Sequence, residues 1–311
     1  MADPPCNGDL TVLIPVLNEA EAIGDVIDEV LSEGVDPRNI LVVDGGSTDG
    51  TVDIARSKGV RVIGQRGKGK ADAVKSALPH IKTRYVLLMD GDYTYPAKHI
   101  RDLCKAKEDG VDEVIGRRIP VGEKTQGPLY RLGNWILTKT FNLLFGTRLK
   151  DVLSGMYLLD KEVLEEMEFK STGFGIESEI AAHVAGTGGE IVEVPIEYRE
   201  RKGEKKLGVR HGLDIISQMI RFSMIYNPVF LVFLIGSLLL IPGLLLGLWV
   251  AYEYFAHGYK YYVKGVVAIV LSAAGFQSLV VALMSLYSKR SEIRILRSLR
   301  RLRKDVNRRS P

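Results

Sequence analysis

Two long stretches without a charged residue constrain the fold of this chain more than any other feature. Residues 229–252 and 265–287 contain no Asp, Glu, Lys or Arg. Each exceeds the roughly 20 residues that a helix needs to cross a bilayer. A lone span in lipid must satisfy its backbone hydrogen bonds internally, which favours helices. Only residues 253–264 separate the stretches, so the sequence predicts a transmembrane hairpin with both flanking segments on one side of the membrane.

The segment after the hairpin indicates which side that is. Residues 289–311 carry ten basic and two acidic residues, a net charge of +8, whereas the whole chain carries +4. Basic segments beside a span stay in the cytosol. We therefore expect an integral membrane protein whose tail and N-terminal region are cytosolic. The tail's position favours anionic lipid, not nucleic acid, as its partner. A soluble protein with two core helices is the alternative.

The first 200 residues alternate strand-like and helix-like patterns. Helical spacing of apolar residues occurs over 19–33, 70–78 and 99–108, and Ser47 or Thr48 is a suitable cap for a further helix. Short apolar runs typical of buried strands occupy 10–17, 39–46, 60–64, 85–90 and 111–116. This alternation predicts an α/β fold with a mostly parallel sheet covered on both faces. Ligands of such sheets bind beyond the carboxyl ends of the strands.

Carboxylates follow two of these predicted strands. Asp44 ends the second strand, and Asp90 and Asp92 follow the fourth, where Gly91 would let the backbone turn tightly between them. Two converging carboxylates repel each other unless a cation lies between them. Oxygen ligands of this kind suit Mg²⁺ or Mn²⁺. An Asp-Gly-Asp turn without a ligand is the alternative.

Other features limit the function. The two cysteines, Cys6 and Cys104, lack metal-ligand spacing, and a structural disulfide is not expected in the cytosol. Residues 64–71, "GQRGKGKA", resemble a phosphate-binding loop, but Ala71 replaces the Ser or Thr that such a loop needs for Mg²⁺. This substitution excludes an ATPase.

Six motifs occur in a fixed order along residues 10–210. They are "IPVLNE" (14–19), "VVDGGSTDGT" (42–51), "GKGKADAVKSA" (67–77), "LLMDGDYTYP" (87–96), "DVLSGMYLLD" (151–160) and "VPIEYRERKGEKKLG" (194–208). Together they resemble the inverting GT-A glycosyltransferases of family 2, specifically the polyprenyl-phosphate (dolichyl-phosphate) sugar synthases. The resemblance implies a Rossmann-like GT-A domain, a nucleotide-sugar donor and a lipid phosphate acceptor.

The resemblance also implies roles for individual residues. Asp90 and Asp92 would bind the metal, Arg117 or Arg118 would face the acceptor phosphate, and Arg201 and Lys206 would clamp the phosphates. The implied donor-site residues are Pro15, Asn18, Glu19, Asp44, Lys70, Lys150 and Ser154. Three positions depart from the family pattern: Gly45 replaces an Asp, Thr94 replaces a Gln that would be a third metal ligand, and Tyr157 replaces an Arg.

The combined prediction divides the chain into four parts. A catalytic domain (1–208) precedes an amphipathic interfacial helix (209–228), the hairpin (229–287) and a basic cytosolic tail (288–311). Residues 131–145 are predicted to form either a second interfacial helix or a core helix. Glu177 and Glu179 are expected to begin a helix, with an acceptor-side or structural role.

The expected activity is inverting transfer of a hexose from GDP or UDP to dolichyl or polyprenyl phosphate at the cytosolic membrane face. No dedicated base is required, because the second pKa of a phosphate is about 6. Residues 218–222, "QMIRF", keep a processive polysaccharide synthase as an alternative. Thr94 and Tyr157 keep a third one, a catalytically weak sugar-nucleotide-binding membrane scaffold. The sequence leaves the nucleotide base and a homo-oligomer open.

Overall fold

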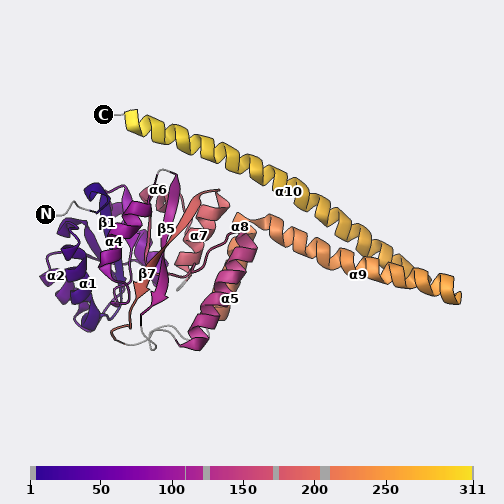
Figure 1. Ribbon diagram of the computed structural model, residues 1–311, viewed down its shortest axis with the longest axis horizontal. Coiled ribbons are helices and arrows are strands. Elements are labelled where there is room, and N and C mark those ends of the chain that lie inside the picture. Colours follow the sequence, from indigo (N-terminus) through magenta and orange to yellow (C-terminus); the bar gives the residue numbers. More distant parts are fainter. Residues whose placement is uncertain (1–4, 109, 122–126, 171–174, 204–210, 310–311) are drawn as a thin grey trace. The chain divides into compact units, whose positions relative to one another are not determined.

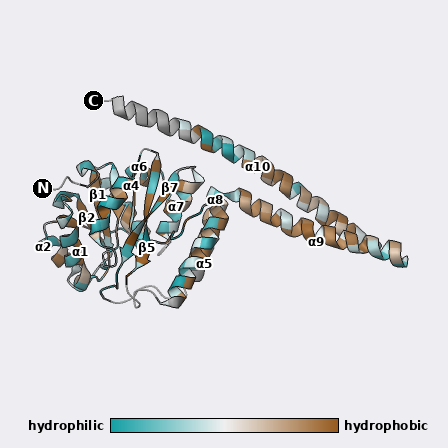
Figure 2. Cartoon of the chain, in the orientation of Figure 1, coloured by the Kyte–Doolittle hydropathy of each residue, from teal (hydrophilic) through white to brown (hydrophobic). Residues whose placement is uncertain are grey.

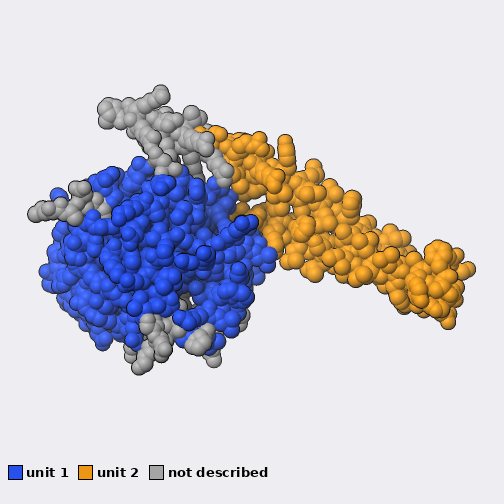
Figure 3. All heavy atoms as spheres, in the orientation of Figure 1, with its two compact units in different colours: residues 1–222 blue, residues 223–311 orange. Residues whose placement is uncertain are grey.

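The computed structural model describes residues 5–108, 110–121, 127–170, 175–203 and 211–309 (Figure 1). The chain forms two compact units, residues 1–222 and residues 223–311 (Figure 3). The first unit contains a sheet with helices on both faces, and the second contains two long helices. The predicted binding residues all belong to the first unit.

The described part of the first unit contains a seven-stranded mixed sheet. Its strands are β1 (Leu10–Val16), β2 (Ile40–Asp44), β3 (Arg61–Gly64), β4 (Tyr85–Leu88), β5 (Val111–Pro120), β6 (Tyr157–Asp160) and β7 (Glu190–Tyr198). Their order is β3-β2-β1-β4-β6-β5-β7, and every neighbouring pair is parallel except the two that involve β6. The predicted mostly parallel α/β sheet is confirmed. Strand β6 was not predicted; its four residues lie inside the motif at 151–160.

Helices cover both faces of this sheet. The described helices between residues 5 and 226 are α1 (Ala20–Ser32), α2 (Thr51–Ser57), α3 (Lys70–Ala77), α4 (Ile100–Ala106), α5 (Pro128–Phe145), α6 (Lys161–Glu165), α7 (Ile176–Gly186) and α8 (His211–Tyr226), which continues past the end of the first unit at residue 222. Single 3₁₀ turns are η1 (Pro5–Gly8), η2 (Pro37–Asn39), η3 (Leu78–His80) and η4 (Ala97–His99). Residues of α1 and α4 join the main hydrophobic cluster on one face of the sheet. On the opposite face, α3 packs against β1 and β2, and α7 packs against β5 and β7.

The hydrophobic pattern of residues 19–33 produces a buried helix face. Ile23, Val26, Ile27 and Val30 of α1 are at most 1 % exposed and pack against alternate residues of β1. Burying each such side chain contributes roughly 1.5–3 kcal/mol. This packing fixes the start of α1, and with it Glu19, beside the carboxyl end of β1.

The predicted cap of the next helix is wrong. The residue preceding α2 is Gly50, and the Asp49 carboxylate accepts hydrogen bonds from the backbone N–H and hydroxyl of Thr51. Ser47 instead accepts a hydrogen bond from the Asn18 N–H, and Thr48 donates its N–H to the Asn18 side chain. Both predicted caps therefore contact Asn18, in the loop after β1, and the helix begins beyond them at Thr51.

A disulfide joins Cys6 in η1 to Cys104 in α4, across 98 residues of sequence. The expectation that these cysteines are unpaired was wrong. It rested on the redox state of the predicted compartment, whereas packing of η1 against α4 places the two side chains together. The bond ties the N-terminal segment to the outside of the sheet domain.

The second unit is a helical hairpin. Helix α9 (Pro228–His257) and helix α10 (Tyr262–Arg309) are both long and apolar enough to cross a membrane (Figure 2). Two glycines let the helices approach closely. A Cβ on Gly243 would lie 2.7 Å from the Ser272 backbone nitrogen, and one on Gly275 would lie 2.4 Å from that of Leu240. Beyond the apolar stretch, α10 continues through the basic segment to Arg309 without a break.

Candidate active site

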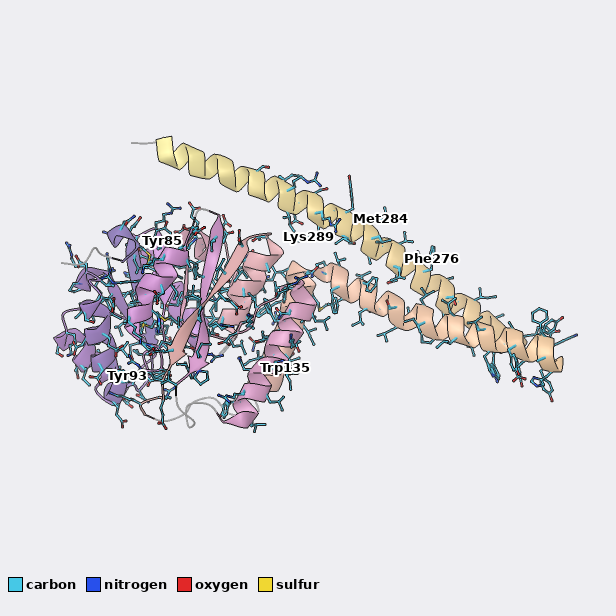
Figure 4. All side chains as sticks on the ribbon, viewed as in Figure 1. Tyr85, Tyr93, Trp135, Phe276, Met284 and Lys289 are labelled. Atoms are coloured by element: carbon cyan, nitrogen blue, oxygen red, sulfur yellow. A yellow bond between two sulfur atoms is a disulfide. The ribbon has the colours of Figure 1, made fainter. Side chains whose placement is uncertain are left out.

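The predicted site residues converge because most strands point the same way. The carboxyl ends of β1, β2, β4, β5 and β7 lie at one edge of the sheet, and the antiparallel β6 starts there. Figure 4 labels Tyr93, which follows β4 at this edge. We call this region the carboxyl edge. It gathers Pro15, Asn18, Glu19, Asp44, Asp90, Asp92, Arg118, Ser154, Gly155 and Arg201.

Asp92 is held by hydrogen bonds on both of its oxygens. Its Oδ1 accepts from the N–H (3.1 Å) and the hydroxyl (2.5 Å) of Thr94, and its Oδ2 accepts from Arg201 Nη1 (3.0 Å). Arg201 also donates to Glu19 Oε1 at 2.5 Å. Burial and the neighbouring charge of Asp90 raise the pKa of Asp92, against the opposing effects of Thr94 and Arg201. Asp92 is therefore a buried carboxylate that gains from additional positive charge.

The segment after β7 brings Arg201 to this position. Arg199 N–H donates to the Thr94 carbonyl (2.9 Å), and Lys202 N–H donates to the Asp92 carbonyl (3.2 Å). Tyr93 adopts a positive φ of 71°, and its ring lies 4.7 Å from the Arg199 guanidinium carbon and 4.0 Å from Lys202 Nζ. These cation–π contacts hold the segment against the loop after β4.

Asp90 is paired with a different basic group. Lys70 Nζ lies 2.6 Å from Asp90 Oδ1 and 2.6 Å from Glu177 Oε1. Burial acts to lower the pKa of Lys70, but the charges of Asp90 and Glu177 outweigh it and raise that pKa well above its ordinary value. Lys70 is thus a permanent cation, not a base. A Cβ on Gly155 would lie 2.0 Å from Asp90 Oδ2, so only glycine leaves room for this carboxylate.

Gly91 has a different role from the one predicted. Its backbone φ lies outside the left-handed region, so its conformation is open to other residues. A Cβ there would lie 2.8 Å from Val16 Cγ1 and 3.2 Å from Ile14 Cγ2. Gly91 therefore allows the loop after β4 to pack closely on β1.

Asp90 and Asp92 fit a divalent cation shared with a ligand. Asp92, which is buried, and Asp90, whose side chain is 33% exposed, repel each other and supply hard oxygen donors. Mg²⁺ or Mn²⁺ usually completes its coordination with water and phosphate oxygens. No group of three His, Cys, Asp or Glu residues that could hold a metal occurs among the described residues. Thr94, at the position where the resemblance gives a third ligand, orients Asp92 instead. The protein's share of such a site is two ligands.

The predicted nucleotide-side residues lie around the ends of β1 and β2. Asp44 accepts hydrogen bonds from the N–H groups of Gly46 (3.0 Å) and Ser47 (3.1 Å), which fixes the loop after β2. Asn18 is exposed with a φ of 50°, and Pro15 is half-buried in β1, opposite Val43 of β2. These residues border an open surface next to Glu19.

Arg117 and Arg118 lie within β5, not after it, because β5 continues to Pro120. Arg118 makes a bidentate ion pair with Asp151, with contacts of 2.8 and 2.6 Å. Burial acts to raise the pKa of Asp151, but Arg118 outweighs it and lowers that pKa. Arg118 is therefore committed to Asp151. The half-buried Arg117 alternates to the other face of the strand.

The remaining predicted residues are distributed differently. Ser154 is 1 % exposed and donates its hydroxyl to the Gly116 carbonyl at 2.5 Å. This bond anchors the segment before β6 to β5, and the role of Ser154 in donor binding stays a prediction. Lys150 is exposed, and its backbone N–H donates to Glu193. Lys206 lies outside the described residues.

The sequence did not indicate the contribution of Tyr95 to this edge, and for Glu177 it left an acceptor-side and a structural role open without naming a partner. Glu177 lies 107 residues from Lys70 in sequence, so no local pattern links them. The buried Tyr95 hydroxyl accepts the Gly155 N–H at 2.6 Å, which supports the glycine that makes room for Asp90. Tyr95 lies within the motif at 87–96, but nothing in the sequence indicates that its hydroxyl contacts Gly155.

A GT-A sheet with an Asp-x-Asp pair and basic side chains at its carboxyl edge is typical of enzymes that transfer sugars. Residues 11–167 match the sequence model of glycosyl transferase family 2, and the chain belongs to this family. Glycosyltransferase AglJ of Haloferax volcanii is 36% identical over 288 residues, covering 90% of this chain and 94% of that protein. The dolichyl-phosphate hexose transferase of the same organism is 36% identical over 212 residues, covering 68% and 92%.

A third relative agrees with this assignment, and a solved structure shares the fold. The dolichol-phosphate mannosyltransferase of Pyrococcus furiosus is 32% identical over 217 residues, covering 64% of this chain and 59% of that protein. Glucosyl-3-phosphoglycerate synthase of Mycobacterium tuberculosis, in complex with Mn²⁺, UDP-glucose and phosphoglyceric acid, superposes with a TM-score of 0.55. It is 23% identical and covers 69% of this chain and 78% of that one, which supports the fold alone.

Proposed function

We propose that this glycosyltransferase moves one hexose from a nucleotide diphosphate to the phosphate of a dolichol or polyprenol. The observation that carries the proposal is the placement of Asp90 and Asp92 beside Lys70 and Arg201 at the carboxyl edge. The same chain ends in two helices that are long and apolar enough to span a bilayer. The relatives named for dolichyl-phosphate or dolichol-phosphate transfer support the acceptor class.

The residues of the carboxyl edge would neutralise the donor. A divalent metal ion on Asp90 and Asp92 would act as a Lewis acid toward the leaving diphosphate. Arg201 and Lys70 place fixed positive charge beside this position, where negative charge develops as the sugar departs. Asn18, Glu19 and Asp44 border the surface proposed for the nucleoside.

The acceptor phosphate needs no catalytic base, since it is largely ionised at neutral pH. One of its oxygens forms a bond to the anomeric carbon while the bond from that carbon to the diphosphate oxygen breaks. Attack opposite the leaving group inverts the configuration. Arg117 remains the proposed contact for the acceptor phosphate, because Arg118 is paired with Asp151.

Helix α5 is proposed to lie in the membrane interface. Leu137, Phe141 and Leu144 are buried against the domain, so the helix has a core face. Five apolar side chains of α5, those of Leu129, Leu132, Trp135, Ile136 and Leu143, are between 41% and 64% exposed, and Arg131 and Lys139 are exposed beside them. Figure 4 labels Trp135 on this helix. A large apolar patch of this kind on a soluble surface is unusual. Contact with the bilayer would bring the lipid phosphate to the domain.

The cytosolic orientation is part of the proposal and rests on the basic residues after the second span. The Cys6–Cys104 disulfide runs against it, because the cytosol generally keeps cysteines reduced. Labelling single cysteines with a membrane-impermeant maleimide in sealed vesicles would test the orientation. Ser298→Cys and Tyr259→Cys, introduced on either side of the second span, should label from opposite faces.

The activity is tested with the purified full-length chain in detergent, a polyprenyl phosphate, Mn²⁺ or Mg²⁺, and radiolabelled UDP- and GDP-hexoses. We expect label from one donor to enter the organic phase. Asp92→Ala should lower the rate by about a thousandfold or more. The matched control is Asp36→Ala, which removes an exposed carboxylate whose side-chain ion pair is with Arg38.

The product identifies the alternatives. A single hexose on each lipid supports the proposal, whereas long water-soluble chains would indicate a processive synthase. Nucleotide binding without transfer from any donor would indicate the binding scaffold and contradict the proposed activity.

A further inference from the structure

Basic side chains occupy both carboxylates of the Asp-x-Asp pair. Lys70 Nζ is 2.6 Å from Asp90 Oδ1, and Arg201 Nη1 is 3.0 Å from Asp92 Oδ2. A divalent cation that binds this pair has to compete with both contacts. The Lys70, Arg201 and Asp92 side chains are 14%, 19% and 11% exposed, whereas that of Asp90 is 33% exposed. Screening by solvent is therefore weak at the Arg201–Asp92 contact and stronger at the Lys70–Asp90 contact.

Each basic group has a second carboxylate as a partner. Glu177 Oε1 is 2.6 Å from Lys70, and Glu19 Oε1 is 2.5 Å from Arg201. The Glu177 and Glu19 side chains are only 12% and 8% exposed. If Lys70 leaves Asp90, it therefore still has a buried ion-pair partner. An ammonium group with three donors can keep one carboxylate while it donates to another group.

The charges of the cluster favour a particular order of binding. The four carboxylates and two basic groups described above leave a net charge of two negative units. This charge attracts a divalent cation, which neutralises it, and repels a diphosphate. The cluster is thus arranged to accept metal before a nucleotide.

We propose that Lys70 and Arg201 hold the metal-binding carboxylates until a divalent cation arrives and then transfer to the donor diphosphate. Glu177 and Glu19 act as positioning residues that retain the two basic groups during the exchange. The inference rests on the proposed function for its donor. Metal and diphosphate would then not compete for the same protein groups. The metal would bind Asp90 and Asp92, and the diphosphate would bind the Lys70 and Arg201 side chains that the metal has released.

A fixed structural ion pair is the alternative explanation, and the two differ in the sign of a mutational effect. In the exchange, Lys70→Met removes a competitor of the metal and makes the cluster more negative. Binding of Mn²⁺ alone should therefore become tighter, by about tenfold. Binding of a nucleoside diphosphate with Mn²⁺ present should become weaker, by about tenfold, because the diphosphate loses a cation. If the ion pair is fixed and only structural, both affinities and the melting temperature of Lys70→Met should fall.

The second variant tests the retaining carboxylate. In Glu177→Gln, Lys70 would have no charged partner left after leaving Asp90, and the cluster carries less negative charge. Mn²⁺ alone should bind several-fold more weakly, the opposite direction from Lys70→Met. Lys70→Arg keeps the charge and should bind Mn²⁺ much as the unmodified chain does. Unchanged Mn²⁺ binding in Lys70→Arg would also show that the effects of Lys70→Met come from the lost charge and not from a general loss of folding.

The experiment measures Mn²⁺ binding by electron paramagnetic resonance on the full-length chain in detergent, without nucleotide. UDP and GDP are then titrated by calorimetry with and without Mn²⁺, and no acceptor or sugar is present. The matched control is Lys75→Met, on the same helix, which removes an exposed lysine 3.4 Å from Asp72 and should change neither affinity. The melting temperature of each variant is recorded in parallel.

Tighter Mn²⁺ binding and weaker diphosphate binding in Lys70→Met would support the exchange. Weaker or unchanged Mn²⁺ binding in that variant would overturn it, as would equally tight diphosphate binding with and without metal. These outcomes are independent of transfer to a lipid, so a wrong acceptor would leave the inference intact. Failure of the unmodified chain to bind Mn²⁺ without nucleotide would overturn the inference, whereas the proposed transfer is tested separately, in an assay that contains donor and metal together.

Discussion

The carboxyl edge of the sheet and the helical hairpin are both closely packed, the edge through charged groups and the hairpin through apolar ones. Several charged groups of the edge are paired with a partner from a distant segment, as with Arg201 and Glu19, 182 residues apart. The packed part of the hairpin has no charged residue and joins two consecutive helices. Both depend on a glycine, Gly155 against a carboxylate and Gly275 against a helix backbone. The missing side chain of Gly155 thus makes room for the Asp90 carboxylate at the edge, and that of Gly275 makes room for the neighbouring helix in the hairpin.

The largest expected effect should separate the stabilities of the two regions. The Cys6–Cys104 disulfide closes a long loop within the sheet domain only. Replacing both cysteines by serine should lower the stability of this domain by roughly 4 kcal/mol, mainly by giving the unfolded chain more freedom. Thermal unfolding followed by circular dichroism in detergent should show an earlier domain transition and an unchanged transition of the hairpin helices.

The control for this change is chemical reduction of the unmodified chain, which should reproduce the shift without a substitution. A variant with both serines that melts as the unmodified chain does would show that the disulfide contributes nothing to the domain. A simultaneous shift of both transitions would show that the two units unfold together, which would break the comparison.

Gly155→Ala tests the edge with a single methyl group. The added Cβ would meet Asp90 Oδ2 at 2.0 Å in a buried setting and displace that carboxylate. Small displacements of groups that position a substrate cost about a hundredfold in rate. We expect transfer to fall by about that factor, with weaker Mn²⁺ binding and little change in the hairpin. Gly133→Ala, where no atom lies within 4 Å of the new Cβ, is the control, and equal activity of both variants would contradict the assignment.

Local patterns were enough to predict most of the sheet and the hairpin. Apolar runs flanked by turn residues gave the parallel strands, and uninterrupted apolar stretches gave α9 and the first part of α10. The short strand β6 was missed because four buried residues carry no periodicity that distinguishes a strand from a loop. Its reversed direction matters, because it places Gly155 at the carboxyl edge beside Asp90.

The pairing of side chains could not be predicted in the same way. The sequence indicated Asp90, Asp92 and Arg201 as members of one site, yet the partner of each charge is set by tertiary packing. Arg118 illustrates the limit, since its motif fits a phosphate contact while the fold pairs it with Asp151. Glu177 shows the converse, because a residue that looked like a helix-start acid holds Lys70.

Gly275→Ala applies the same chemical change to the hairpin. Its Cβ would lie 2.4 Å from the Leu240 backbone nitrogen, so the helices must separate. Overpacking of this kind typically costs about 2 kcal/mol. Transfer to a lipid phosphate in vesicles should fall while Mn²⁺ and nucleotide binding remain. Gly247→Ala, whose Cβ would only touch Ala268 at 3.7 Å, is the matched control. Loss of nucleotide binding in Gly275→Ala would show that the hairpin shapes the carboxyl edge.

The last comparison concerns Glu113, a buried carboxyl group within the sheet that lacks the pairing seen at the edge. It is 1 % exposed in β5, and its Oε2 has no hydrogen-bond partner among the described residues. Burial, with the adjacent charge of Asp112, raises its pKa from 4.5 to about 8, against the effect of Lys107. The folded chain therefore keeps a proton that the unfolded chain loses between these two pH values.

Folding stability should fall as pH rises through this window, by about 1.4 kcal/mol per pH unit for this one group, because the unfolded state binds fewer protons there. Glu113→Gln, which cannot ionise, should lose that slope and be more stable than the unmodified chain near pH 8. Glu168→Gln, with its side chain 84% exposed, should keep the original slope. Unfolding of the sheet domain across the window measures the difference. Parallel stability curves for the unmodified chain and Glu113→Gln would mean that Glu113 is solvated or paired, and the sheet would then match its charges as fully as the edge does.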